Sequence, residues 1–529
     1  MRLLDDLKMY ARFTAGLPGY LRRTISLEEA RAIIRRRLET REANFLEVVE
    51  HGIFNNPRSP YRPLLDLAGC GLGDIRAMVR DRGLEGTLMA LREAGVYFTF
   101  EEFKGRQPVV RGGRVITVEP RDFDNPRLSK SFRGETGGST GAGSRVNTDL
   151  DHLAAQAPYL MVTWEAHGVL NIPKAIWRGI LPDASGINYI LRAARFGRVP
   201  DRWFTHLVAR DLKISPKYRM ATYATLAMGR LSGVPMPWPE PVRVDEASVV
   251  ARWAAETLEA RGRCLILTQV SRALRVCLAA REEGPDLTGT TFLVGGEPPT
   301  PAKVRVINST GAGHFPVYTF AEAGRIAMGC SRPADGNDLH HIKDSVALIQ
   351  VPRLVPGFGV TVGAFNCTTL LSSTPKVLLN VEIDDYGIIE KRSCGCPLEE
   401  LGYTEHLRRV YSFSKLTGEG VTLVGSEMLH ILEEVLPARF GGSLQDYQLL
   451  EEEDRDGFTR LSLVISPKVE ITDERSVIET VMEALGKSSC AAEQARAIWD
   501  RAGTLEIKRM EPVWTARGKM MPLHLIRRD

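Results

Sequence analysis

Residues 263–294 read RCLILTQVSRALRVCLAAREEGPDLTGTTFLV. The first seven residues, Arg263–Gln269, form a β-like apolar run, and Thr290–Val294 form a second one. Between the two runs, Ser271–Glu283 has the apolar spacing of a helix. A strand, a crossover helix of about a dozen residues and another strand are the parts of a parallel βαβ unit. The stretch therefore predicts an α/β fold built on parallel strands.

The segments before and after this unit extend the same domain. Ser26–Glu50 begins with a serine cap and early glutamates, and its apolar residues recur at helical spacing. Asn55–Pro60 interrupts that pattern and predicts a loop. Ile75–Asp81 and Gly86–Ala94 are two further candidate helices. Downstream, the apolar run Val346–Ile349 predicts a buried strand.

The C-terminal part has a different pattern. Two strands and two helices are expected there, at Leu461–Ile465, Ile471–Leu485, Ala491–Ala502 and Leu505–Arg509. This order is typical of a small α+β domain, and about 110 residues is an ordinary domain size. A chain of 529 residues is also too long for one compact core. We therefore expect a large N-terminal domain, residues 1–411, and a small C-terminal domain, residues 412–529.

Composition indicates a globular protein of ordinary type. The chain is 43% hydrophobic and 25% charged, with a formal net charge of +4. This charge is close to neutral for the length, so we expect no nucleic-acid partner. Met1–Arg22 mixes charged residues throughout, unlike a secretory signal, and no apolar run is long enough for a transmembrane helix. These features predict a cytoplasmic protein without a membrane partner.

A glycine-rich segment is the first candidate binding site. Residues 134–144 read GETGGSTGAGS, with five glycines and four hydroxyl residues. Glycine lets backbone N–H groups approach an anion closely, and hydroxyl groups add hydrogen-bond donors. The segment lacks the GKS or GKT ending of a Walker loop. Composition alone leaves two interpretations, a phosphate-binding loop and a flexible surface loop.

Three later motifs favour the phosphate-binding interpretation. They are GGEPPT at residues 295–300, YTFAEAG at residues 318–324 and RGK at residues 517–519. In content and order, these motifs resemble those of the adenylate-forming superfamily, which includes acyl-CoA synthetases, adenylation domains and luciferases. The match is most similar to its phenylacetate-CoA ligase branch, which NPRSPY at residues 56–61 and the region Gly95–Glu102 also resemble. The resemblance covers nearly the whole chain.

The resemblance implies a role for each motif in binding ATP. The phosphate loop would comprise Thr136, Gly137, Gly138, Ser139, Thr140 and Gly141. The segment Gly296, Glu297 and Pro298 would line the adenine, with Tyr318 stacked on it. Asp385, in the predicted turn Asp384–Gly387, would bind the ribose hydroxyls. Glu322 would hold Mg²⁺, and Lys519 would contact the acyl phosphate from a mobile C-terminal domain.

The chemistry of adenylation accounts for these residue types independently. A carboxylate that attacks the α-phosphorus of ATP is an anion approaching an anion, so Mg²⁺ and a cation are needed to offset the charge. Glu322 can hold the metal, and Lys519 can supply the cation. A carboxylate such as Asp385 can accept hydrogen bonds from both ribose hydroxyls. Taken singly, each residue has an ordinary structural explanation as a helix-start, tail or turn residue.

Several positions depart from the family pattern. Ala321 and Gly137 stand where the family usually has hydroxyl residues. The hinge motif is degraded in SFSKLTGEG, residues 412–420, where Lys415 is the candidate hinge residue. His167 lies where relatives place an aromatic residue or a histidine at the acyl pocket. For His167, we keep both a pocket role and a structural role open.

A second cluster predicts a metal site. Cys330 precedes the pair His340–His341, and Cys394-Gly395-Cys396 follows. Three thiolates and one imidazole complete a tetrahedral Zn²⁺ site and leave no open position, so the metal would be structural. The phenylacetate-CoA ligase branch often carries a comparable cluster, with the histidine after Asp-Leu, which favours His340. The alternative is buried free cysteines beside two surface histidines.

These features predict an ATP-dependent, AMP-forming acid ligase. The leading expectation is that an aryl or other hydrophobic acid forms an acyl-adenylate and then a thioester with CoA. An amine such as an amino acid, or a carrier protein, is an alternative acceptor. A non-catalytic paralogue is a further alternative because of Ala321 and Gly137. Relatives are often dimers, so a homodimer is also an expectation.

Overall fold

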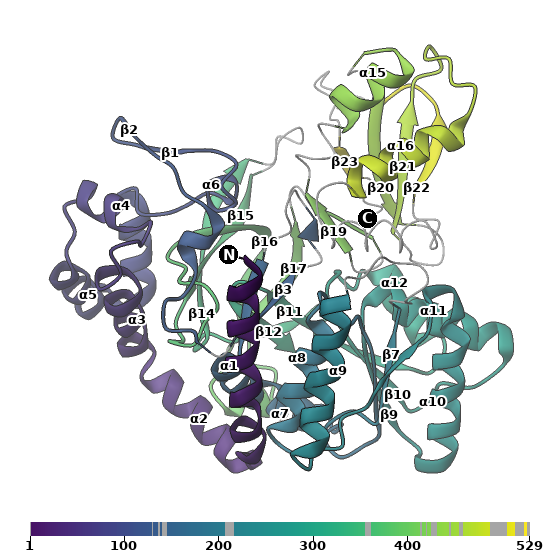
Figure 1. The fold of residues 1–529 in the computed structure, drawn as a ribbon, viewed down its shortest axis with the longest axis horizontal. Helices are drawn as coiled ribbons and strands as arrows, with labels where there is room; N and C mark the ends of the chain where they lie inside the picture. The colour runs from purple at the N-terminus through teal and green to yellow at the C-terminus, as the bar shows by residue number, and fades with distance from the viewer. Residues whose placement is uncertain are drawn as a thin grey trace.

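The computed structural model describes residues 2–129, 131–135, 138–139, 145–206, 216–354, 361–412, 415–418, 421–424, 431–443, 446–453, 459–486, 505–513 and 523–525. A twelve-stranded sheet with helices packed on it forms the large body of the molecule, and a four-stranded sheet forms a smaller C-terminal part. In Figure 1 the smaller part lies above the large one. The predicted α/β class is therefore confirmed.

The large sheet is parallel in one half and antiparallel in the other. In sheet order its strands are β14 (Val346–Leu354), β15 (Thr361–Thr369), β16 (Val381–Lys391), β17 (Glu405–Ser412), β13 (Leu339–His341), β12 (Gly324–Gly329), β11 (Gly313–Phe320), β10 (Thr290–Val294), β9 (Cys264–Thr268), β6 (Lys174–Trp177), β7 (Arg202–Thr205) and β8 (Pro239–Pro241). Strands from β11 to β8 pair parallel, and those from β11 to β14 pair antiparallel. Strand β11 belongs to both halves.

The predicted βαβ unit is confirmed. Strand β9 and strand β10 pair parallel, with Cys264 opposite Thr290, and α11 (Val270–Glu283) connects them. Every residue of β9 is buried, as expected for a strand covered on both faces. The predicted strand at Val346–Ile349 is the first half of β14.

Helices cover both faces of the parallel half. Leu265 and Leu267 of β9 pack in the same core as α7 (Leu150–Ala166) and α8 (Ser185–Ala194). Ile266, between them, packs in the core of α10 (Ala247–Arg261) and α11. Because successive side chains of a strand point to opposite faces, this division places one helical layer on each side of the sheet.

The large body contains nine further α-helices among the described residues. They are α1 (Arg2–Arg22), α2 (Leu27–Glu39), α3 (Arg41–Val49), α4 (Arg62–Leu67), α5 (Leu72–Glu93), α6 (Phe100–Phe103), α9 (Pro216–Leu231), α12 (Pro301–Asn308) and α13 (Pro397–Glu400). Ser26 caps α2 in a capping box with Glu29, as its sequence predicts. The two helices expected between residues 75 and 94 are one element, α5, kinked at Gly83, where φ is +69°. Only glycine adopts this φ readily, so the kink falls there.

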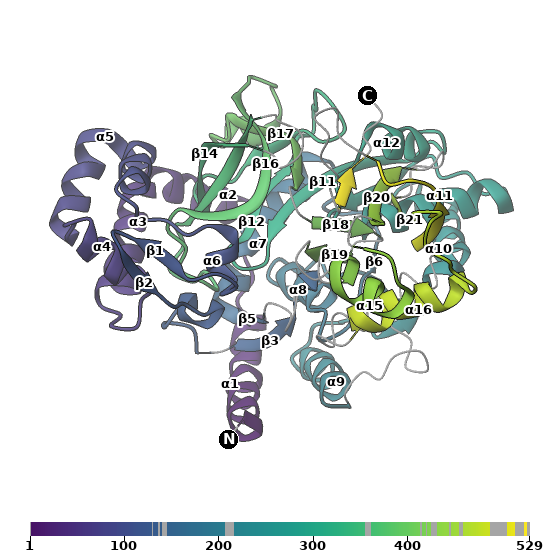
Figure 2. The ribbon, with the colours of Figure 1, turned by 90° about the horizontal axis from the view of Figure 1, so that it is seen from above.

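The C-terminal sheet has the order β22 (Leu505–Arg509), β21 (Thr459–Ile465), β20 (Tyr447–Glu453) and β23 (Leu523–Leu525), with α15 (Leu436–Phe440) and α16 (Glu474–Gly486) beside it (Figure 2). The strands predicted at Leu461–Ile465 and Leu505–Arg509 are confirmed. Helix α16 begins three residues later than predicted, because the Asp473 carboxylate accepts a hydrogen bond from the Arg475 N–H and caps it. The helix predicted at Ala491–Ala502 lies outside the described residues.

The predicted domain boundary falls at the end of the large sheet. Strand β17 ends at Ser412, and β18 (Lys415–Gly418) then pairs with β19 (Val421–Val424). Lys415, the candidate hinge residue, is the first residue of β18.

Within the described residues, no helix combines the length and apolar character that crossing a membrane requires.

A buried hydrogen-bond network joins α7 to the antiparallel half of the sheet. Asp344 has no exposed surface, and its carboxylate accepts hydrogen bonds from the Tyr159 hydroxyl at 2.7 Å and the Tyr403 hydroxyl at 2.8 Å. Arg37 donates to the Tyr159 oxygen at 3.1 Å. Burial raises the pKa of Asp344, although the hydroxyl donors and Arg37 oppose this. Helix α2, helix α7 and the β13–β14 connection are thus held together.

We predict that Asp344→Ala lowers the free energy of unfolding by about 2–4 kcal/mol, because it leaves two buried hydroxyls without their acceptor and removes the negative charge near Arg37. Urea denaturation measures the change. Glu119→Ala is the control, since Glu119 forms an exposed ion pair with Arg121 at 2.7 Å. Its effect should stay within about 0.5 kcal/mol. Equal losses in the two variants would contradict the importance of the network.

Candidate functional site

The loop after β10 lies against β11. A Cβ atom on Gly295 would come within 2.9 Å of the Val317 carbonyl oxygen, so only glycine allows this approach. Gly296 has a φ of +88°. The Glu297 carboxylate, 6% exposed, accepts hydrogen bonds from Ser271 and lies 3.5 Å from the Lys303 ammonium. The structure thus places the predicted segment 296–298 beside the strand that carries Tyr318.

Tyr318 and Asp385 meet although β12, β13 and β17 separate their strands in the sheet order. The Tyr318 hydroxyl on β11 donates to Oδ2 of Asp385 on β16 at 2.7 Å, and the Ser412 hydroxyl donates to Oδ1. Burial and the Asp385 charge raise the pKa of Tyr318, so the phenol stays protonated and can donate. Two residues that the sequence assigns to one nucleotide are therefore in contact.

The turn predicted at Asp384–Gly387 is wrong. The segment lies inside β16, where Asp385 pairs with Ser412 and Tyr386 with Tyr411. The backbone hydrogen bonds of β17 keep it extended. The irregularity that resembles a turn is local: Asp384 has a φ of +63°, and the register shifts between Tyr386 and Ile388. This shift has the character of a bulge, which redirects side chains within a strand.

Glu322, the predicted magnesium ligand, is buried in an ion pair. It follows β11, and its Oε1 atom lies 2.7 Å from the Lys104 ammonium, which α6 positions. The two side chains are 3% and 11% exposed, respectively. Burial raises the pKa of Glu322, but Lys104 outweighs burial and leaves the pKa below its ordinary value. The carboxylate is thus charged and already neutralised by a cation that sequence analysis missed.

Four of the six residues of the predicted phosphate loop lie outside the described residues: Thr136, Gly137, Thr140 and Gly141. The flanking strands β3 (Ser131–Glu135) and β5 (Arg145–Asp149) pair antiparallel, and β5 leads directly into α7. Gly138 and Ser139 form a short strand, β4, that pairs parallel with Thr422 and Leu423 of β19. The loop therefore contacts a hairpin of the predicted C-terminal domain. Lys519, in the same predicted domain, also lies outside the described residues.

His167 lies away from this group. It caps the C-terminus of α7, whereas the phosphate-loop hairpin precedes the N-terminus. A helix of 17 residues spans about 25 Å. The imidazole stacks on Phe315 with ring centroids 3.8 Å apart, and its Nε2 atom lies 2.9 Å from the Gly329 carbonyl oxygen. Burial lowers the pKa of His167 to about 4, so the ring is neutral. The structure does not bring it to Tyr318 and Asp385.

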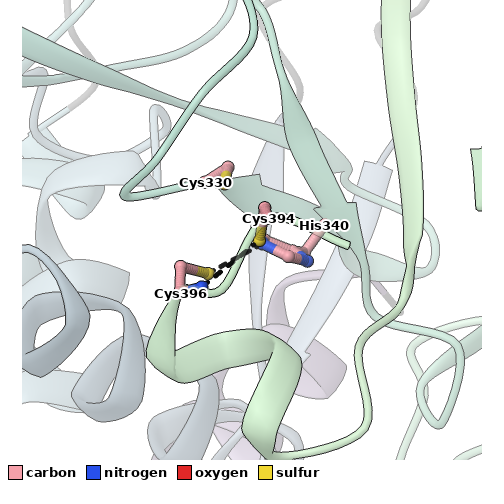
Figure 3. A group of neighbouring side chains, drawn as sticks. All are labelled: Cys330, His340, Cys394 and Cys396. Atoms are coloured by element: carbon pink, nitrogen blue, oxygen red, sulfur yellow. Dashed lines mark hydrogen bonds between the residues drawn. The ribbon is translucent and has the colours of Figure 1, made fainter. Parts of the chain in front are cut away.

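The structure brings Cys330, His340, Cys394 and Cys396 together (Figure 3). Their four candidate ligand atoms all lie within 4.8 Å of one another, with His340 Nε2 at 3.1 Å from the Cys396 sulphur and 3.6 Å from the Cys394 sulphur. Cys330 follows β12, His340 lies on β13, and Cys396 precedes α13. His341, the next residue on β13, is not in the group.

The donor atoms fit a tetrahedral Zn²⁺ ion. Zinc bonds of about 2.3 Å to sulphur and 2.0 Å to nitrogen place such ligand atoms roughly 3.5–3.8 Å apart. The Nδ1 atom of His340 lies 2.7 Å from the Tyr403 carbonyl oxygen, which accepts its proton and leaves Nε2 unprotonated toward the sulphurs. A hydrogen bond from the Cys330 thiol lowers the pKa of Cys396 well below its ordinary value, despite burial. A thiolate and an oriented imidazole are ready for a metal.

Two contributors have no sequence signal. Lys104 lies 218 residues before Glu322 and follows an aromatic-rich segment without a motif. Tyr403 contacts His340 through its backbone carbonyl oxygen, and every residue has such an oxygen, so the residue type does not predict this contact. Only proximity in the fold identifies either residue.

We predict that Lys104→Met lowers the free energy of unfolding by about 3–5 kcal/mol at pH 7, because it leaves the buried Glu322 charge without its ion-pair partner. The folded-state pKa of Glu322 is depressed, so this stabilisation is complete above its unfolded value near 4.5 and is lost as pH falls through the folded value. Denaturation at pH 7 and at pH 4 should show the penalty shrinking at the lower pH. Lys468→Met, which breaks an exposed pair with Glu511, is the control. A penalty independent of pH would contradict the ion pair.

Comparisons with known proteins identify the fold. The sequence matches no family model and no curated protein. Among solved structures, 2-hydroxyisobutyryl-CoA ligase in complex with 2-HIB-AMP and CoA aligns with a TM-score of 0.55 and 14% identity, over 95% of this chain and 91% of that chain. An amide bond synthetase from Marinactinospora thermotolerans aligns over 73% of this chain and 96% of its own, with a TM-score of 0.36 and 14% identity. The first match shows that the chain has the fold of an adenylate-forming ligase.

Proposed function

We propose that the protein activates a carboxylic acid with ATP, forms an acyl-adenylate with release of pyrophosphate, and then transfers the acyl group to the CoA thiol with release of AMP. The main support for this proposal is the contact between Tyr318 and Asp385. The fold is shared with 2-hydroxyisobutyryl-CoA ligase, whose structure holds an acyl-AMP and CoA. A fold alone does not define an activity. The contact between Tyr318 and Asp385, two residues that we expect to bind the nucleotide, therefore supports the proposed site.

In this proposal the nucleotide lies between the β10–β11 loop and the end of β16. The Tyr318 ring would stack on the adenine, and the segment Gly296–Pro298 would line its edge. Asp385 would accept hydrogen bonds from the ribose. Each carboxylate oxygen has two lone pairs, so Asp385 can bind hydroxyls while Tyr318 and Ser412 hold it in place. The phosphates would reach the loop around Gly138 and Ser139.

The charge that develops during adenylation needs cations. Mg²⁺, when bound with ATP, offsets the negative charge of the phosphates during the in-line attack of the carboxylate. Glu322 does not fit a metal in the conformation described, because Lys104 engages its Oε1 atom. We therefore derive no step through the metal. Lys519 would supply the second cation from the C-terminal domain.

CoA is the leading acceptor because the aligned 2-hydroxyisobutyryl-CoA ligase is a CoA ligase. Transfer to an amine or to a carrier protein is the alternative within the same first half-reaction, and a non-catalytic paralogue is the alternative outside it. The resemblance to the phenylacetate-CoA ligase branch favours an aryl or other hydrophobic acid. Product identification by mass, with CoA or amino acids added, separates thioester from amide formation.

Pyrophosphate exchange with a panel of acids tests the first half-reaction. We predict exchange in the wild type and a rise of about 10–100-fold in the KM for ATP in Asp385→Ala, because the ribose loses a charged acceptor. Lys391→Ala, an exposed position on the same strand, is the control and should match the wild type. Absence of both exchange and ATP binding would contradict the proposed activity.

The two half-reactions can be separated through Lys519. We predict that Lys519→Ala loses adenylation by about 100-fold or more, since a transition-state cation is removed, yet still converts a supplied acyl-adenylate. Single-turnover assays of each half-reaction provide the measurement. An equal loss in both steps would contradict a C-terminal domain that alternates between them.

The proposal includes a structural zinc ion held by Cys330, His340, Cys394 and Cys396. Zinc binding would tie the end of β12, strand β13 and the loop before α13 to one point. The fourfold set of protein ligands leaves no open position, so the ion would stabilise the fold and take no part in adenylation.

Metal analysis tests this ion. We predict about one zinc per chain in the purified protein, loss of that zinc in the double variant Cys394→Ser and Cys396→Ser, and a lower melting temperature after chelation. Cys70→Ser, which changes a half-buried cysteine outside the cluster, should retain the metal. A native wild-type protein that contains no zinc would exclude the site.

A further inference from the structure

Three arginines surround one tyrosine beside the parallel half of the sheet. Arg178 follows β6, Arg192 lies on α8 and Arg325 lies on β12. Their guanidinium carbons lie 5.5, 4.7 and 6.0 Å, respectively, from the centre of the Tyr189 ring, which is 5% exposed. We call these four residues the arginine cluster. Elements far apart in the sequence thus bring three permanent positive charges to one buried position.

Arg325 interacts with the Tyr189 hydroxyl but with no carboxylate among the described residues. Its side chain is among the largest that are fully buried, at 1% exposure, and none of its three guanidinium nitrogens has an acceptor in ordinary hydrogen-bond geometry. Arg178 donates to the Thr268 carbonyl oxygen at 2.5 Å, but its Nε atom lacks an acceptor. Among the described residues, no carboxylate forms an ion pair with any arginine of the cluster.

One half-buried side of α8 adds unpartnered polar atoms to the cluster. Ser185, Asn188 and Arg192 are spaced three and four residues apart, so they lie on one side of the helix. The Ser185 hydroxyl and the Asn188 side-chain oxygen are buried without hydrogen bonds.

The electrostatic balance of the cluster is strongly positive. Burial raises the pKa of Tyr189, but the charges of Arg325, Arg178 and Arg192 outweigh burial and leave that pKa below its ordinary value. Burial and the nearby Arg325 lower the pKa of Arg192 to about 10. A buried, unpaired guanidinium costs several kcal/mol, so an anion that completes the cluster would be strongly favoured.

The position of the cluster indicates a ligand. Arg178 and its acceptor, the Thr268 carbonyl, lie at the carboxyl ends of the neighbouring parallel strands β6 and β9. Open α/β sheets bind ligands at this edge. Arg325 pairs in register with Thr319, the residue after Tyr318. Arg325 is thus one residue pair away from Tyr318 along the β11–β12 pairing, and the cluster uses none of the residues of the proposed nucleotide site.

We infer that the acid substrate carries a second anionic group, such as another carboxylate or a phosphoryl or sulfonyl group, and that Arg178, Arg192 and Arg325 bind it. This inference rests on the proposed adenylation. The reacting carboxylate loses its charge as it becomes an anhydride, so three arginines around it would stabilise the ground state more than the transition state. A group that keeps its charge through the reaction has no such penalty. The Tyr189 ring suits an aryl acid with an anionic substituent.

Matched pairs of acids test this inference. The probes are terephthalate against 4-methylbenzoate and adipate against hexanoate, each assayed for pyrophosphate exchange and, without ATP, for the shift in melting temperature that it causes. We expect the wild type to prefer the dianionic member by about 100-fold or more in kcat/KM and to show the larger shift with it, because each buried charge pair contributes strongly. Arg325→Met and Arg192→Met should abolish both preferences.

A second readout separates binding from a structural role. Without ligand, Arg325→Met should melt at a higher temperature than the wild type, because an unpaired buried charge is replaced by an apolar side chain of similar length. A lower melting temperature would mean that the fold depends on Arg325 and would overturn the inference. Arg219→Met, an exposed arginine on α9, is the control for loss of a charge.

Two further outcomes would overturn the inference. Equal use of both members of each pair, with equal thermal shifts, would mean that no second anionic group is bound, while exchange itself would leave the proposed adenylation standing. A loss of ATP affinity in Arg325→Met, with an unchanged preference between paired acids, would assign the cluster to the phosphates of ATP. Absence of exchange with every acid, together with absence of ATP binding, would instead contradict the proposed function.

Discussion

Strand β11 joins the two halves of the sheet, and the candidate site depends on its double pairing. One edge of β11 pairs parallel with β10, and the other pairs antiparallel with β12. The first pairing places the loop at Gly295 against Val317, the residue before Tyr318. In the antiparallel half, the Tyr318 hydroxyl contacts Asp385 of β16. Parallel strands need covering helices, whereas antiparallel strands can follow one another through short turns. The site forms where these two kinds of sheet meet.

Two buried charged residues close to β11, Glu322 and Arg325, differ in whether they have an ion-pair partner. Glu322 follows this strand and is matched by Lys104, so the pair is neutral and mainly supports the fold. Arg325 lies three residues later on β12 and lacks any such partner in the described structure. Proteins seldom retain an unpaired buried guanidinium unless a ligand compensates for it. The contrast between these two neighbours distinguishes a structural ion pair from a position that requires an anion.

Local patterns predicted the fold class and much of the secondary structure. The apolar runs at Arg263–Gln269 and Thr290–Val294 are short enough to be strands, and the intervening helix forces a parallel pairing. Motif order also predicted that Tyr318 and Asp385 would serve one ligand, and cysteine spacing predicted the group around His340. The turn predicted at Asp384–Gly387 failed because pairing with β17 extends that segment into a strand. Tertiary hydrogen bonds override a local turn preference.

By itself, the sequence determined an α/β chain with a glycine-rich loop, a set of candidate nucleotide contacts and a cysteine–histidine cluster. These features are encoded by residue type and spacing within short segments. Only the tertiary structure decided that Lys104 neutralises Glu322, that Tyr403 orients His340, and that Arg178, Arg192 and Arg325 surround Tyr189. The partners in these contacts are remote in sequence, and arginine or lysine is usually a surface residue. Burial and the absence of a counter-charge become visible only when the strands and helices are packed together.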